Sequence, residues 1–189
     1  LALKLSKLGR GSVGANPMVG CVITRDDNII AQDYHRHYGE SHAEVNALDQ
    51  INHQAQDCKV YVTLEPCSHQ GKTPPCVKAL INAKVSKVFV ATLDSNPEVS
   101  GSGVSLLRDS GIEVEVGLLE NAALEINRGF FKRMKTGLPF VTSKIAMSLD
   151  GRVAMKNGQS KWITSDASRN CLLYTSPSPR DGLLSRMPS

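Results

Sequence analysis

The sequence lacks a long apolar run. A helix that crosses a membrane needs roughly 20 consecutive apolar residues, whereas the apolar residues here, 41% of the 189, are dispersed along the chain. Lys4 and Lys7 interrupt the apolar stretch at residues 1–8, which is too short and too polar for the core of a signal peptide. We therefore expect no membrane partner and a cytoplasmic location.

The sequence also lacks a strong charge excess and a paired set of cysteines. The formal net charge is +4, and the basic cluster from Lys132 to Lys135 is more typical of a solvated helix end than of a nucleic-acid surface. Five cysteines at irregular spacing argue against a disulfide framework and for a reducing compartment. We expect no nucleic-acid partner, and buried thiols at Cys21 and Cys58, which lie in apolar, strand-like surroundings.

Strand-like and helix-like patterns alternate along the chain. Ser41 is a plausible N-cap for one helix, and Pro75 is well placed as the first residue of another. Such alternation predicts an α/β sheet with helices on its faces. The expected strands are 18–24, 29–34, 59–64, 85–92 and 112–116, and the expected helices are 1–8, 42–53, 75–83, 104–110 and 118–134.

Three residues in the middle of the chain have the chemistry of a zinc site. His42, Cys67 and Cys76 offer one imidazole and two thiolates, a set that suits a zinc ion whose fourth position is left to water. Glu44 follows the histidine by two residues and is placed to move protons beside the metal, as in zinc-dependent nucleobase deaminases. A His-x-Glu or a Pro-Cys pair alone is weak evidence, but the combination favours hydrolytic deamination. The alternative is a closed structural zinc site with His69 as its fourth ligand.

Two of these groups are expected at helix amino termini. The partial positive charge of a helix terminus favours an anion, so we expect a stabilised thiolate at Cys76 and an ionised carboxylate at Glu44. On this reading the helices form the site before the metal binds.

Several longer motifs resemble the bifunctional riboflavin-biosynthesis family, in which a diaminohydroxyphosphoribosylaminopyrimidine deaminase is joined to a 5-amino-6-(5-phosphoribosylamino)uracil reductase. The resemblance implies a cytidine-deaminase-like three-layer α/β/α domain with a mixed sheet at 1–136. A truncated start of a dihydrofolate-reductase-like α/β domain would follow at 137–170, and a non-family tail, disordered or spurious, at 171–189. The motifs are Asn16-Pro17-Met18-Val19-Gly20-Cys21-Val22, His42-Ala43-Glu44-Val45, Thr63-Leu64-Glu65-Pro66-Cys67-Ser68-His69, Gly71-Lys72-Thr73-Pro74-Pro75-Cys76 and Asp94-Ser95-Asn96-Pro97.

The eight residues between the two cysteines set this chain apart from deaminases that use a Cys-x-x-Cys spacing. They include His69, Lys72 and Thr73, donors of the kind that hold a phosphate monoester. The resemblance implies deamination of 2,5-diamino-6-(5-phosphoribosylamino)pyrimidin-4(3H)-one, with Glu44 serving as both base and acid. It also implies contacts to the base and the ribose phosphate from Asn16, His35, His69, Lys72, Asp94 and Asn96.

The chain changes character after Met134. Residues 139–147 are apolar and strand-like, and the resemblance implies that Ala146 and Trp162 touch NADPH and that Ser160 touches the substrate. Residues 171–189 are rich in proline and serine and show no periodicity, so a linker is the alternative to a spurious tail. A homo-oligomer is also expected.

Two other functions stay open at this point. One is the deamination of another nucleotide or of tRNA adenosine, which the cysteine spacing disfavours. The other is a catalytically silent, zinc-stabilised binding module, against which the intact Glu44 argues.

Overall fold

The computed structural model describes residues 1–96, 100–160 and 163–175, with the backbone alone given for 172–175. By its internal contacts the chain separates into two units, Leu1–Phe140 and Val141–Ser189. Each unit is described by itself below.

The first unit is built on a five-stranded sheet in the order β2-β1-β3-β4-β5. Strand β1 pairs antiparallel with both β2 and β3, whereas β3, β4 and β5 run parallel. The hairpin turns at Asp26 and Asp27, whose φ angles of 48° and 62° suit a tight turn between twisted strands. The expected mixed sheet is confirmed. The strands are β1 (Gly20–Arg25), β2 (Asn28–Tyr34), β3 (Lys59–Val62), β4 (Lys87–Val90) and β5 (Glu113–Val116).

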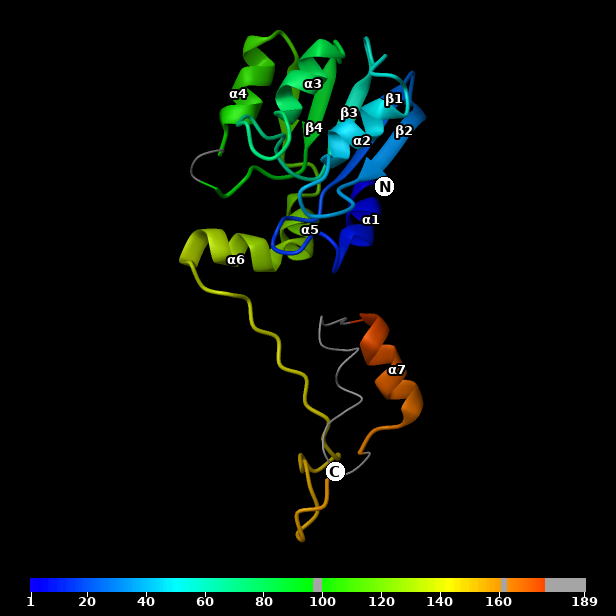
Figure 1. Cartoon of the computed structure of the whole chain (residues 1–189), viewed down its shortest axis with the longest axis vertical. Helices are drawn as coiled ribbons and strands as arrows, with labels where there is room; N and C mark the ends of the chain where they lie inside the picture. Colours follow the sequence, from blue (N-terminus) through cyan, green and yellow to red (C-terminus); the bar gives the residue numbers. More distant parts are fainter. Residues whose placement is uncertain (97–99, 161–162, 176–189) are drawn as a thin grey trace. The chain divides into compact units, whose positions relative to one another are not determined.

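Helices connect the strands and cover the sheet. Figure 1 shows α2, α3 and α4 together on one face, and α1 and α5 contact each other elsewhere in the unit. The helices are α1 (Ala2–Ser6), the 3-10 turn η1 (Lys7–Gly9), α2 (Ala43–Asp49), α3 (Cys76–Asn82), α4 (Ser102–Asp109), α5 (Glu120–Ile126) and α6 (Arg128–Thr136), with α7 (Asp166–Thr175) in the second unit.

The hydrophobic core follows from strand alternation, because successive side chains point to opposite faces of the sheet. Ile23, Val60 and Val88 are fully buried and belong to the same cluster as residues of α2, α3 and α4. On the opposite face the rings of Tyr61 and Phe89 stack 4.6 Å apart. Cys21 and Cys58 are fully buried, as their apolar surroundings predicted, and neither forms a disulfide.

Two helix starts differ from the expectation by one residue. His42, not Ser41, is the N-cap of α2, with extended backbone at φ −75° and ψ 166°. Pro75 is the N-cap of α3 and lies just outside the helix instead of forming its first residue. Consequently His42 and Cys76 both lie at the very start of a helix.

The helix expected at 118–134 is two helices. It breaks at Asn127, whose buried side chain bonds the backbone of Met18 instead of facing solvent from a continuous helix. Helix α2 ends at Asp49, earlier than the expected residue 53, because Asn52 and His53 adopt left-handed backbone angles of φ 49° and 57°. Both corrections depend on tertiary contacts and turn geometry that the apolar periodicity did not contain.

The strand expected at 139–147 does not form: these residues, which span the end of the first unit and the start of the second, are irregular chain. A strand needs a neighbour to pair its backbone groups, and the described residues beyond Val141 contain no other strand. Helix α7 continues to Thr175, five residues into the expected tail, and the rest of that tail lies outside the described residues. Among the described helices, none is both long and apolar enough to span a bilayer.

Candidate metal centre and substrate cavity

The three predicted zinc ligands come from three segments that meet at one edge of the sheet. His42 caps α2, which follows β2; Cys67 lies just beyond the end of β3; and Cys76 is the first residue of α3. Ligand sites in α/β sheets commonly lie beyond the carboxyl ends of the strands, where the chain turns into the helices. The sequence therefore delivers all three side chains to a single point.

The ligand atoms have the spacing of a tetrahedral metal site. The Nδ1 atom of His42 is 3.5 Å from Sγ of Cys67 and 3.3 Å from Sγ of Cys76, and all three atoms lie within 4.8 Å of one another. Zinc bond lengths of about 2.3 Å to sulfur and 2.0 Å to nitrogen place such atoms about 3.6 Å apart at a tetrahedral angle. The donor set therefore fits Zn²⁺. Among the described residues His69 is not a member of this group.

The two thiols share a charge before any metal is considered. The hydrogen bond from Cys76, helped by His42, lowers the pKa of Cys67 to about 4. The same interaction, together with burial, raises the pKa of Cys76. The backbone N–H of Cys76 also donates to the Cys67 sulfur, at 3.3 Å. Before any metal binds, the contact between the two sulfurs thus favours the thiolate form of Cys67, whereas a coordinated metal holds both sulfurs deprotonated.

Glu44 is a buried carboxyl group beside the ligands. It is 3% exposed, and its Oε2 atom has no hydrogen-bond partner among the described residues. Burial raises the pKa of Glu44 to about 7, although the nearby His42 lowers it. In the metal-free chain burial therefore opposes the ionised form that the helix terminus was expected to favour. A pKa near neutrality suits a group that both takes and gives protons.

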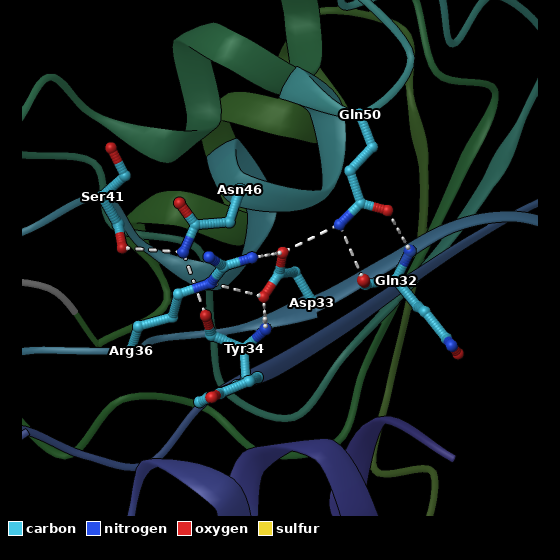
Figure 2. A network of polar contacts seen from close by, with 7 residues as sticks. All are labelled: Gln32, Asp33, Tyr34, Arg36, Ser41, Asn46 and Gln50. Atoms are coloured by element: carbon cyan, nitrogen blue, oxygen red, sulfur yellow. Dashed lines mark hydrogen bonds and ion pairs between the residues drawn. The ribbon is translucent and has the colours of Figure 1, made fainter. Parts of the chain in front are cut away.

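A polar network centred on Asp33 fixes the C-terminal end of α2 against strand β2 (Figure 2). The carboxylate accepts from Arg36 Nη2 at 2.7 Å and from Gln50 Nε2 at 2.8 Å. Gln50 in turn donates to the carbonyl oxygen of Gln32 at 2.9 Å, which ties the cap of α2 to strand β2. The side chain of Asp33 is only 4% exposed, so this network lies within the fold.

A second pair of bonds fixes the loop between β2 and α2. The Nδ2 group of Asn46 donates to the carbonyl oxygens of Tyr34, at 3.0 Å, and Ser41, at 3.2 Å (Figure 2). These two carbonyls bracket the loop that carries His35 and leads into His42. Both imidazoles are therefore held by contacts from α2, and their rings meet edge to face at 5.2 Å.

The predicted substrate contacts line one cavity of about 350 Å³ together with His42, Glu44 and Cys67. All six of the predicted residues from this unit are present. The lining also includes residues that were not predicted from the sequence, among them one from the β2–α2 loop and three from α6. The predicted six are Asn16, His35, His69, Lys72, Asp94 and Asn96, and the four are Tyr38, Phe130, Arg133 and Met134.

His35 and Lys72 differ in how they face this cavity. His35 is 3% exposed; its Nδ1 atom contacts the carbonyl oxygen of Ser41 at 3.1 Å, and burial lowers the pKa of its imidazole. A neutral ring that donates from Nδ1 leaves Nε2 as an acceptor, and Nε2 has no partner among the described residues. Lys72 is exposed, with its ammonium 4.2 Å from the centre of the Tyr38 ring.

Helix α6 reaches the cavity because Asn127 anchors it. The amide of Asn127 accepts from the N–H of Met18 at 2.8 Å and donates to its carbonyl oxygen at 2.9 Å. Six residues later Arg133 donates to the carbonyl oxygen of Ala15 at 3.0 Å. The helix is thereby fixed on the loop that carries Asn16, which explains why its residues line the cavity. The i, i+4 spacing of Phe130 and Met134 indicates that both lie on one face of a helix. Nothing in the sequence indicates that this face lines the cavity.

The predicted reductase contacts lie in the second unit. Ala146 is half-buried and Ser160 is exposed, with its hydroxyl donating to the Val153 carbonyl oxygen at 2.7 Å. Neither residue lines the cavities found among the described residues. Trp162 lies outside the described residues.

Two family models match the chain. The cytidine and deoxycytidylate deaminase zinc-binding region matches residues 1–92, and the RibD C-terminal domain matches residues 139–175. The first of these matches contains all three candidate ligands, His42, Cys67 and Cys76, and also Glu44. The two matches cover separate parts of the chain.

Known proteins resemble the chain over most of its length. It is 49% identical to riboflavin biosynthesis protein RibD of Escherichia coli over 168 residues, 89% of this chain and 46% of that protein. The structure of Acinetobacter baumannii RibD superposes with a TM-score of 0.86 at 51% identity, covering 92% of this chain and 49% of that one. The chain therefore spans about half the length of these relatives.

A shorter relative matches almost from end to end. The diaminohydroxyphosphoribosylamino-pyrimidine deaminase of Buchnera aphidicola subsp. Schizaphis graminum is 50% identical over 138 residues, 73% of this chain and 94% of that protein. Together with the RibD structure, this match confirms the cytidine-deaminase-like fold expected for the first unit. The chain belongs to the diaminohydroxyphosphoribosylaminopyrimidine deaminase family of riboflavin biosynthesis.

Proposed function

We propose that the first unit is a zinc-dependent deaminase that converts 2,5-diamino-6-(5-phosphoribosylamino)pyrimidin-4(3H)-one and water to 5-amino-6-(5-phosphoribosylamino)uracil and ammonia. The observation that carries the proposal is the position of Glu44. Its carboxyl group is buried and has an oxygen without a partner among the described residues, in the same cavity as His42 and Cys67. The name of the Buchnera relative supports the choice of substrate.

The proposed roles follow from the chemistry of the side chains. His42, Cys67 and Cys76 would hold zinc, which would supply the Lewis acidity that makes water a nucleophile at neutral pH. Glu44 takes the proton from water and delivers protons to the ring nitrogen and to the departing amine. One water is consumed and one ammonia leaves, so an oxygen replaces the exocyclic nitrogen.

The proposed substrate contacts fall into two groups. Asn16, His35, Asp94 and Asn96 offer the donors and acceptors that a pyrimidine edge requires, and the bare Nε2 of His35 is suited to accept from an amino group. His69 and Lys72 lie in the exposed loop between the two cysteines and would hold the ribose phosphate by charge. On this proposal the amidine-like base and the phosphate of the substrate are bound by different segments of the chain.

For the second unit we propose only that it is related to the RibD C-terminal domain. The match to the RibD C-terminal domain supports NADPH as a cofactor of the complete reductase domain, with Ala146 and Trp162 as its proposed contacts and Ser160 as a proposed substrate contact. The cysteines of the first unit form no disulfide, which is in keeping with the expected cytoplasmic location. Homo-oligomeric assembly stays a prediction, which sedimentation of the purified chain would check.

The test of the proposed function is ammonia release by the zinc-loaded protein. The diaminopyrimidine ribotide, deoxycytidylate and a tRNA anticodon arm are supplied separately. We expect ammonia from the ribotide alone. Release from deoxycytidylate or tRNA in its place would support another deaminase, and zinc-loaded protein that releases ammonia from none of the three would support a silent binding module.

A further inference from the structure

Glu65 is a buried carboxylate to which the proposed mechanism gives no task. It is 4% exposed and lies two residues before the ligand Cys67. Both of its oxygens are fully occupied by backbone N–H groups from a segment far along the chain. Oε2 accepts from Asp94 at 3.1 Å and Gly101 at 2.9 Å, and Oε1 accepts from Gly103 at 2.9 Å and Val104 at 3.1 Å.

Two of these bonds cap helix α4 from outside. The first N–H groups of a helix have no partner within it, and the N-cap of α4, Gly101, has no side chain to supply one. The carboxylate of Glu65 takes that place and brings a negative charge to the positive end of the helix dipole. A helix normally finds this hydrogen-bond acceptor in its own N-cap residue. For α4 the acceptor is instead the carboxylate of Glu65, which belongs to the segment that carries the metal ligand Cys67.

The segment with Pro66 and Cys67 packs tightly against the start of helix α4. A Cβ atom placed on Gly103 would lie 2.1 Å from the carbonyl oxygen of Pro66, so only glycine permits this approach. Beside it the hydroxyls of Ser68 and Ser102 are 2.6 Å apart. The start of α4 is thus held against the Pro66-Cys67 backbone by a carboxylate, a close backbone contact and a hydroxyl pair.

The remaining bonds reach the wall of the cavity. Glu65 holds the N–H of Asp94, and the carboxylate of Asp94 in turn accepts from the N–H of Asn96 at 2.8 Å. Asp94 and Asn96 both line the cavity that contains Glu44. One side chain therefore connects the backbone of the ligand segment with the backbone of the opposing wall.

We propose that Glu65 is a positioning residue, which sets the distance and orientation of the Asp94–Asn96 wall relative to the metal ligands. A pyrimidine base bound to this wall is then held at the correct distance and orientation from Glu44. The inference rests on the proposed function, since it assigns the wall to substrate binding. It predicts that loosening the wall weakens substrate binding while the metal stays in place.

The first test is Glu65→Gln, which keeps the size of the side chain. The amide replaces one acceptor oxygen with an NH2 group that faces backbone donors. We expect KM for the ribotide to rise roughly tenfold or more, because misplacement by about 1 Å can change rates by 10²-fold, with zinc retained at one per chain. The matched control is Glu120→Gln, which removes an exposed carboxylate from the first turn of α5 and should leave KM unchanged.

A second variant disturbs the contact between Pro66 and α4 by a change in the helix instead of in Glu65. Gly103→Ala leaves the carboxylate intact but forces α4 away from the Pro66 carbonyl oxygen. We expect the same rise in KM with zinc retained. An unchanged KM in either variant, or a loss of zinc as large as the loss of activity, would overturn the proposal.

Amide hydrogen exchange gives a readout that does not depend on turnover. In Glu65→Gln the amides of Asp94, Gly103 and Val104 should lose protection, whereas the strand amides of β3 should keep it. If the wild-type protein releases no ammonia, the proposed function fails while exchange still tests the connection. Unchanged protection of these three amides would overturn the positioning role whatever the activity.

Discussion

Glu44 is the residue on which proton transfer depends. Glu44→Gln keeps the shape of the side chain and removes its ability to carry a proton, so we expect kcat to fall by about 10²–10⁴-fold. Ammonia release under saturating substrate measures this, and elemental analysis should show unchanged zinc. Glu125→Gln, an exposed position on α5, is the matched control. Turnover within a few-fold of wild type would remove Glu44 from the mechanism.

Asp33 should make the stability of the protein depend on acid. Burial raises the pKa of Asp33, but its hydrogen bonds with Arg36 and the Tyr34 N–H outweigh burial and lower that pKa below its ordinary value. A group with a lowered folded-state pKa stabilises the fold above its ordinary pKa of about 3.9 and loses that contribution as pH falls through the folded-state value.

The variant Asp33→Asn therefore separates charge from shape. We expect it to lower the free energy of unfolding by about 2 kcal/mol at neutral pH, a typical contribution of hydrogen bonds to a charged group. Its stability should also fall less steeply than that of wild type below pH 4. Urea unfolding at pH 7 and pH 3.5 measures both effects, with the exposed Asp49→Asn as control. Parallel pH profiles for Asp33→Asn and wild type would contradict this account.

The loop between the two cysteines is the element that should read the phosphate. Lys72→Ala removes a cation from the cavity wall, so we expect weaker binding of the ribotide and unchanged binding of its dephosphorylated analogue. Lys78→Ala, an exposed lysine two residues into α3, should affect neither. The KM values of the two substrates give the comparison, and equal losses on both would exclude phosphate reading by Lys72.

Helix α6 depends on the anchor at Asn127. Asn127→Ala removes two hydrogen bonds to Met18, each worth about 1 kcal/mol net, so we expect a loss of about 2 kcal/mol in urea unfolding. KM should rise as well, because Phe130 and Arg133 lose their fixed place in the wall. Asn82→Ala, on the exposed side of α3, should stay within about 0.5 kcal/mol of wild type. Full stability of Asn127→Ala would show that packing alone holds the helix.

The same elements show how far the sequence could be interpreted. The ligands His42, Cys67 and Cys76 were predictable because a metal demands particular atoms, and their motif places those atoms at strand and helix ends. Glu65 stands in the same motif, yet its role was invisible, because its partners are backbone N–H groups with no chemical signature. The wall formed by α6 was hidden for a related reason: the bond between Asn127 and Met18 joins positions far apart in the chain.

Zinc should contribute to the stability of the whole first unit. Its ligands join the β2–α2 loop, the end of β3 and α3, so binding to the folded state alone raises the free energy of unfolding. We expect one zinc per chain and a marked fall in melting temperature on chelation. The double variant Cys67→Ser, Cys76→Ser should lose the metal and show no response to chelator. Cys171→Ser, an exposed cysteine of α7, should behave as wild type. Zinc kept by the double variant would refute the ligand assignment.

The bond from Asn127 to Met18 also bears on the order in which a newly made chain becomes competent. Once the chain has emerged through α3, all three metal ligands exist, but the loop at Met18 still lacks the partner that lies 109 positions later. Synthesis at about 5–20 residues per second leaves an interval of several seconds before α6 is available. During that interval a nascent chain could capture its metal while having no closed wall against which to hold a nucleotide. Metal acquisition would then precede substrate recognition within the life of each molecule.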